Sequence, residues 1–279
     1  DLSASGVNLA LDFQPNSANH SVGGLALHFD GGAHATVLAP GAATLPAYFS
    51  TPSMSPSFNG LVPSSMAPYR LALAVSDDAL NQLLAASLEA GVLDQRLVGG
   101  LTVAGMPFAA DAGSLALAAP GLGFEKFDPA APIIIQLHAG VAPVARVATS
   151  GNDLLQLAVS GLEVDFRVEV VPGYEISALR VAISGDLGAN VTFNAMAGTL
   201  DITAGSIMTQ VDGLDSLPGV DPAASLVALN GLVSALVPSL LTGLQGIPVS
   251  GLLPTAVPLA LAGIEAAGPS GDFVAIYLD

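Results

Sequence analysis

One stretch of this chain, from Pro222 to Ile264, runs for 43 residues without a charged side chain. So long an uncharged stretch limits the possible folds, because its apolar side chains must be removed from water. It can cross a membrane, fill a protein core or line an apolar cavity. The choice between these three decides which class of protein the chain belongs to.

The first half of this stretch is predicted to form a helix. Asp221 and Pro222 provide an N-cap followed by proline at the first helical position. Apolar residues then recur at helical spacing, and Pro238 is expected to kink the helix. The apolar stripe consists of Leu226, Leu229, Val233, Leu236, Leu240 and Leu244.

A membrane-spanning helix is the less favoured interpretation of this segment. A span needs about 20 apolar residues, and residues 222–244 are numerous enough. However, Asn230, Gly231 and Pro238 interrupt them, no Lys or Arg flanks them, and the chain has no Trp. We therefore expect a helix buried in the core, or a helix packed on a sheet with a lipid between the two.

The composition of the chain excludes several classes of function. Its 279 residues carry a net charge of -17, from 23 acidic and 6 basic residues. Binding to nucleic acids or to anionic lipid headgroups needs clustered Lys and Arg, which this chain lacks. The absence of cysteine excludes disulfides and thiolate catalysis. With 52% hydrophobic residues, the chain is expected to fold.

The sequence also lacks the motifs of catalysis and of metal binding. It contains no G-x-S-x-G nucleophile elbow, no P-loop and no dinucleotide-binding fingerprint. The four histidines have no metal-ligand spacing, and Asp212, Asp215 and Asp221 fit no calcium-loop pattern. We therefore expect no enzymatic activity, no cofactor and no metal.

The N-terminal third is predicted to be extended. Apolar residues alternate in Val7–Phe13 and in Leu25–Phe29, which indicates a β-hairpin or two neighbouring strands. Turn signals lie at Gln14–Ser17 and at Gly31-Gly32. The six prolines between residues 40 and 68 predict a linker or a crossing segment.

A strand followed by a helix is the clearest local prediction. Tyr69–Val75 alternates, and Ser76 is a good N-cap followed by two acidic residues in the first turn. Gly91 can close the helix. The helical stripe consists of Leu80, Leu83, Leu84 and Leu88.

From Leu97 to Val211 the sequence predicts a series of strands. Leu162–Val170 alternates strictly between apolar and charged residues, as in an antiparallel strand with one buried face. A change of phase near Ser177 predicts a bulge. Short strands are expected between the glycines that follow it, and Phe273–Leu278 is a further predicted strand. Those glycines are Gly185, Gly188, Gly198 and Gly205.

The region around the first helix resembles a known family. The segment Leu71-Ala-Leu-Ala-Val-Ser76-Asp77-Asp-Ala-Leu-Asn81-Gln-Leu-Leu, followed by Gly91-Val-Leu, resembles the bactericidal/permeability-increasing family of tubular lipid-binding (TULIP) proteins. The order of the remaining predicted elements, including residues 221–244, Gly246-Ile247-Pro248 and Phe273–Leu278, is similar to that family as well.

This resemblance implies an α+β fold, in which a highly curved antiparallel sheet wraps as a barrel around a long C-terminal helix and one shorter helix. It divides the chain into strands of a central sheet or of a preceding barrel (1–39), a linker (40–68) and a lipid-binding barrel (69–279). The resemblance is also compatible with an upstream barrel domain or a partner subunit. The low content of basic residues departs from family members that bind the phosphates of lipopolysaccharide, and the family's disulfide is absent.

The function that follows is non-enzymatic binding, and transfer, of a lipid or other hydrophobic molecule by an extracytoplasmic protein that touches membranes transiently. The alternative is a structural or adhesive β-rich surface protein without a ligand. For each candidate lipid contact, plain core packing is an equally good interpretation. The candidates are Leu80, Leu84 and Leu88 on the first helix, and Leu229, Val233, Leu236 and Leu240 on the second.

Overall fold

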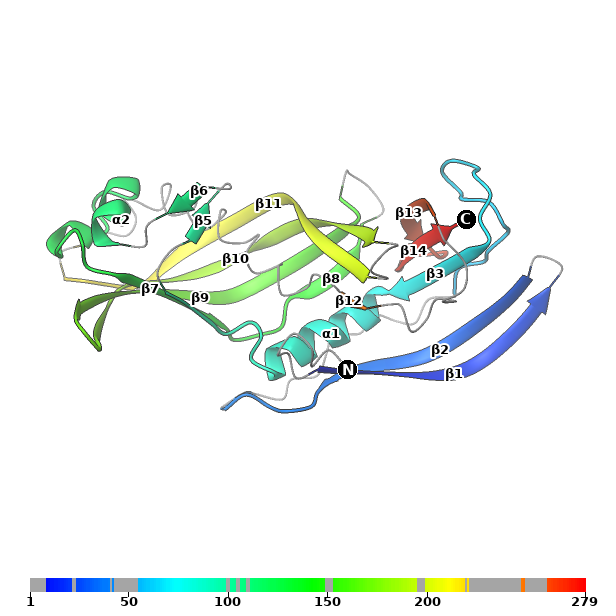
Figure 1. The fold of residues 1–279 in the computed structure, drawn as a ribbon, viewed down its shortest axis with the longest axis horizontal. Helices are drawn as coiled ribbons and strands as arrows, with labels where there is room; N and C mark the ends of the chain where they lie inside the picture. Colours follow the sequence, from blue (N-terminus) through cyan, green and yellow to red (C-terminus); the bar gives the residue numbers. More distant parts are fainter. Residues whose placement is uncertain are drawn as a thin grey trace.

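The computed structural model describes residues 9–21, 24–40, 42, 55–98, 101–103, 106–108, 111–148, 153–194, 199–218, 220, 247–248 and 260–279. Over these residues the molecule is elongated, with long curved strands along its length (Figure 1). Every strand pairing among them is antiparallel. The predicted α+β class with antiparallel sheets is confirmed. The predicted helix over residues 221–244 lies outside the described part of the chain.

The largest sheet has seven strands in the order β12-β11-β10-β9-β7-β4, with β8 also paired to β9. Within the described residues this sheet is open, because β12 and β4 are not paired with each other, so the expected closed barrel is not formed there. Its strands are β4 (Gln95–Val98), β7 (Ile133–Ala139), β8 (Val144–Val147), β9 (Leu155–Val171), β10 (Tyr174–Asn194), β11 (Thr199–Ser216) and β12 (Ile247–Pro248).

The alternation predicted for Leu162–Val170 is confirmed in β9 as far as Glu169: the apolar residues up to Val168 are buried and the charged residues between them are half-buried, whereas Val170 is exposed. The predicted bulge is confirmed as a shift of register between Ser177 and Leu179. The prediction of short strands is wrong, because β10 and β11 continue through their glycines. A Cβ at Gly185 would lie 2.1 Å from the Met208 carbonyl oxygen, so glycine permits the close approach of these two strands.

The N-terminal hairpin is confirmed, but its predicted turn is wrong. Strands β1 (Leu9–Ser21) and β2 (Gly24–Ala35) pair along their whole length, and the expected turn at Gln14–Ser17 is instead an irregularity within the ladder. Proline can occupy such a site because it lies outside the regular hydrogen-bond pattern. At the base of the hairpin, Leu9 packs with Leu83 of α1.

A three-stranded sheet, β13-β14-β3, joins distant parts of the chain. It consists of β3 (Leu71–Ser76), β13 (Leu261–Ala267) and β14 (Phe273–Leu278). The strands predicted at Tyr69–Val75 and Phe273–Leu278 are therefore confirmed. Part of the proline-rich segment packs on this sheet. Val62 is buried, and Phe58 and Tyr69 surround Tyr277 of β14.

The first helix, α1 (Asp77–Glu89), is confirmed with its predicted cap. The Ser76 hydroxyl accepts a hydrogen bond of 3.2 Å from the Ala79 N–H, and Gly91 follows the helix at φ 72°. The sequence did not predict the second helix, α2 (Ala112–Ala118), or the short 3-10 helix η2 (Phe124–Lys126). These two elements cover one end of the seven-stranded sheet together with a two-stranded ribbon, β5 (Leu101–Val103) and β6 (Met106–Phe108) (Figure 1).

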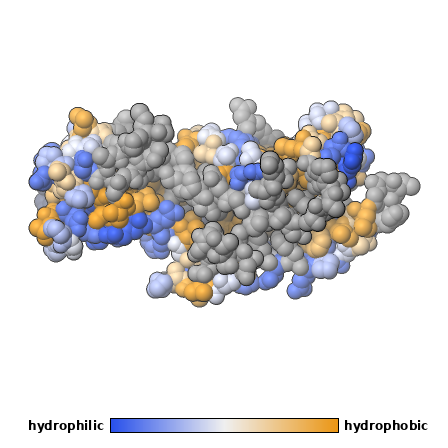
Figure 2. Space-filling view, viewed as in Figure 1, coloured by the Kyte–Doolittle hydropathy of each residue, from blue (hydrophilic) through white to orange (hydrophobic). Residues whose placement is uncertain are grey.

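Two core clusters pack against the large sheet. One lies below α2 and η2, where Phe124 contacts Phe166 of β9 edge to face. The other lies below α1 and includes Leu84, Leu157 and Ile202. On the face drawn in Figure 2, hydrophobic patches alternate with hydrophilic ones over the described residues.

Candidate functional site

An apolar pocket lies between α1 and the large sheet. Its enclosed volume is about 10 Å³, room for about one water molecule. No residue that lines it carries a polar side chain. The lining residues are Leu80, Leu83 and Leu84 of α1, Ala145 of β8, Leu155 and Leu157 of β9, and Ile202 of β11.

The periodicities of helix and strand bring these side chains together. Residues three and four apart lie on one face of a helix, so Leu80 and Leu84 point to the same side of α1. Residues two apart lie on one face of a strand, so Leu155 and Leu157 both face the helix. The pocket therefore arises where the apolar stripe of α1 crosses the apolar face of β9.

Asn81 fixes the distance between α1 and the sheet. Its side-chain N–H donates to the Ala145 carbonyl at 3.0 Å, and its oxygen accepts from the Ala145 N–H at 2.6 Å. Asn81 thus pairs with the backbone of β8 as a neighbouring strand would. The residue is only 2% exposed, and a buried amide without partners would destabilise the fold.

The N-terminus of α1 carries a buried carboxylate beside the pocket. Burial raises the pKa of Asp77, and the nearby Asp78 and Asp272 raise it further, while Arg146 opposes them. The Asp77 Oδ1 atom is buried and has no hydrogen-bond partner among the described residues. An acidic residue in the first turn is expected to be stabilised by the helix dipole. For Asp77, burial has the larger effect on the pKa and raises it.

The candidate lipid contacts named from sequence fall into three groups. Leu80 and Leu84 line the pocket. Leu88 is buried in the neighbouring core cluster, with Leu93 and Leu122. The four candidates on the second predicted helix, Leu229, Val233, Leu236 and Leu240, lie outside the described residues.

Several pocket residues were not identified from sequence. Leu83 belongs to the helical stripe and could have been included on spacing alone. Ala145, Leu155 and Ile202 could not, because they come from three strands whose pairing depends on contacts far apart along the chain. No local pattern distinguishes them from other apolar strand residues.

Neither a metal centre nor a membrane-spanning helix is present in the described ranges. No group of three or more His, Asp or Glu side chains there could hold a metal ion. Likewise, no helix among those residues is both long enough and apolar enough to cross a bilayer. Two histidines each contact a single aspartate: His138 lies 2.9 Å from Asp94, and His34 lies 3.3 Å from Asp12.

Comparison with known proteins finds similarity to solved structures. No protein-family model matches the chain, and no curated protein matches it. The structure is similar to the crystal structure of lipopolysaccharide binding protein, with 18% sequence identity and a TM-score of 0.44. The alignment covers 97% of this chain and 53% of that protein, so the chain spans about half of that protein's length.

Proposed function

We propose that this protein binds a lipid, or another long hydrophobic molecule, without catalysing a reaction. The observation that carries this proposal is the pocket below α1, which only apolar side chains line. Ligand pockets normally add a few polar groups that orient a substrate. A pocket without them suits a ligand that is recognised by its apolar surface alone.

Burial of an acyl chain supplies the affinity in this proposal. Each buried CH₂ group contributes about 0.8 kcal/mol before ordering costs. The enclosed space is about 10 Å³, room for about one water molecule, far below the roughly 300–1,000 Å³ of ordinary ligand pockets. Binding of an acyl chain therefore requires α1 to move away from the sheet, or further lining residues. Leu229, Val233, Leu236 and Leu240 are proposed as those further residues.

The proposed ligand is recognised through its chain rather than through phosphates on its headgroup. The neighbour in the structure comparison is a lipopolysaccharide binding protein, but this chain has only 6 basic residues. Three of its arginines already contact its own carboxylates: Arg70 with Asp279, Arg96 with Glu175, and Arg167 with Glu175 and Asp165. Transfer of the bound lipid between membranes, in an extracytoplasmic compartment, is part of the same proposal.

Uptake of a dansyl-labelled fatty acid by the purified chain tests the proposal. We expect saturable fluorescence enhancement, and at least a tenfold weaker affinity after Leu84→Trp fills the pocket or Leu80→Gln makes it polar. Leu80 is half-buried, so Leu80→Gln is tolerated more easily if Leu84→Trp disturbs folding. Leu117→Trp is the matched control, because Leu117 on α2 is 86% exposed and away from the pocket.

Two outcomes would contradict lipid binding. The first is that no lipid co-purifies in native mass spectrometry and no probe is taken up. The second is uptake that the pocket variants leave unchanged. The first outcome would favour a structural or adhesive surface protein, a function to which the exposed apolar row Leu25, Leu27 and Phe29 on β2 is suited.

A further inference from the structure

The hairpin between β9 and β10 projects beyond the rest of the large sheet. The ladder between β7 and β9 ends at Ile133 opposite Val168, and the ladder between β10 and β11 begins at Leu179 opposite Ser216. Among the described residues, the two strands therefore pair from 170 to 177 only with each other. This tip lies at the opposite end of the molecule from the end of β1 and the start of β2 (Figure 1).

The end of this projection is apolar and exposed. Val170, Val171 and Tyr174 are 38%, 57% and 61% exposed, and Pro172 and Gly173 between them are exposed as well. Five consecutive exposed residues without a charge are unexpected in a chain whose net charge is -17. Exposed apolar groups gathered at one place indicate a contact surface.

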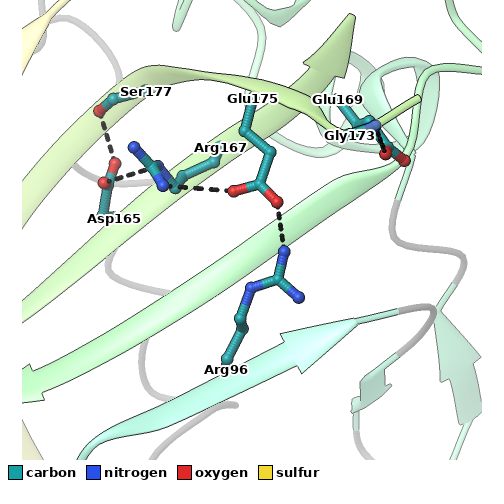
Figure 3. Close-up of polar contacts among 7 residues, drawn as sticks. All are labelled: Arg96, Asp165, Arg167, Glu169, Gly173, Glu175 and Ser177. Atoms are coloured by element: carbon teal, nitrogen blue, oxygen red, sulfur yellow. Dashed lines mark hydrogen bonds and ion pairs between the residues drawn. The ribbon is translucent and has the colours of Figure 1, made fainter. Parts of the chain in front are cut away.

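The carboxylates next to the tip have ion-pair or hydrogen-bond partners (Figure 3). Glu175 pairs with Arg96 of β4, and also with Arg167 of β9 at 3.2 Å. Glu169 accepts a hydrogen bond of 2.7 Å from the Gly173 N–H inside the turn. Two of the chain's 6 basic residues are thus placed against one glutamate beside an apolar tip.

We propose that this tip, residues 170–174, inserts into the interface of a zwitterionic lipid bilayer, and that lipid passes between the membrane and the protein while it is docked. The role in lipid passage rests on the proposed function. Charge supports this choice of partner. An acidic protein is repelled by anionic surfaces, whereas residues 170–174, which carry no charge, can approach a surface without net charge.

The chemistry of the tip also fits a bilayer interface. Tyrosine has an apolar ring and a polar hydroxyl, and it is enriched where hydrocarbon meets headgroups. The two valines beside it can enter the acyl boundary without removing a charge from water. Because no excess of positive charge is present at the tip, docking is expected to depend on apolar contact rather than on anionic lipid.

The chain has no Trp, so a single introduced tryptophan reports on its own surroundings. We expect the fluorescence of a Tyr174→Trp variant to shift to the blue on addition of phosphatidylcholine vesicles. A Leu27→Trp variant, at an exposed apolar site on β2, is the matched control and is expected to show no shift. Flotation with the same vesicles should fall about tenfold for Val171→Ser combined with Tyr174→Ser, and not for Leu25→Ser combined with Leu27→Ser.

The results separate this inference from the proposed function. Vesicle binding that phosphatidylserine strengthens, or that the tip variants leave unchanged, would overturn docking by the tip. The absence of any vesicle binding would also overturn docking by the tip, and it would indicate that the tip contacts a protein partner instead. Uptake of the dansyl fatty acid needs no vesicles, so its presence without docking would overturn only the inference. Docking without uptake would overturn the proposed function and leave membrane contact standing.

Discussion

At the scale of single residues, the pocket depends on a polar side chain. Asn81 was part of the sequence pattern that resembles the lipid-binding family, but the pattern did not reveal what the residue contacts. Its amide pairs with both backbone groups of Ala145. An amide can do this because it has both a donor and an acceptor, which no apolar residue provides.

Replacing Asn81 by Ala is expected to reduce the free energy of unfolding by about 2–3 kcal/mol, because the Ala145 N–H and C=O would remain buried without partners. Urea denaturation followed by circular dichroism measures the loss. Asn16→Ala is the control, because Asn16 bonds Asp30 at an exposed site and should lose less than about 0.5 kcal/mol. Equal losses in the two variants would contradict the structural role assigned to Asn81.

At the scale of elements, the helix and the strand before it could be predicted because their signals are local. Ser76 caps α1 within a few residues of its own position, and the leucine stripe needs no distant partner. The prediction that the glycines of β10 separate short strands was wrong because it needed information about a distant strand. Whether a glycine ends a strand or permits close packing depends on the strand opposite, which lies elsewhere in the sequence.

Gly185→Ala is expected to destabilise the protein by about 2–3 kcal/mol, because a new methyl group would press on the backbone of β11. The nearest atoms, the Met208 carbonyl oxygen and the Thr209 Cα, belong to backbone that cannot move independently. Gly140→Ala is the control, because no atom lies closer than 4.0 Å to its added Cβ. Thermal unfolding of both variants checks the difference, and a tolerated Gly185→Ala would mean that the strands can separate freely.

At the scale of the whole molecule, the sequence predicted the class of fold better than the site. Antiparallel sheets follow from alternation, and an apolar interior follows from composition. The pocket, however, requires α1, β8, β9 and β11 to meet, and only the residues on α1 carried a local signal. The exposed tip at Val171 and Tyr174 was also missed, because alternation alone does not show where neighbouring strands end.

The net charge of -17 is expected to oppose folding by self-repulsion at low ionic strength. Raising NaCl from about 10 to 150 mM shortens the screening length from roughly 30 to 8 Å. We expect a gain of about 1 kcal/mol, equivalent to a rise of roughly 2–4 °C in Tm. Differential scanning calorimetry tests this, with sucrose at equal osmolality as the control. A fall in Tm would show that ion pairs such as Arg70–Asp279 outweigh the repulsion.

The pairing of β3 with β14 has a consequence for how the chain is made. Ser76, which caps α1, lies opposite Phe273 in that ladder, and the Glu265 carboxylate accepts from the N–H of Ser64, 201 residues earlier. A ribosome adds about 5–20 residues per second. The strand that leads into α1 therefore waits roughly ten seconds or more for its partner during synthesis. The strands that line the pocket, β8, β9 and β11, are synthesised within that interval, so they are available to α1 before β14 is.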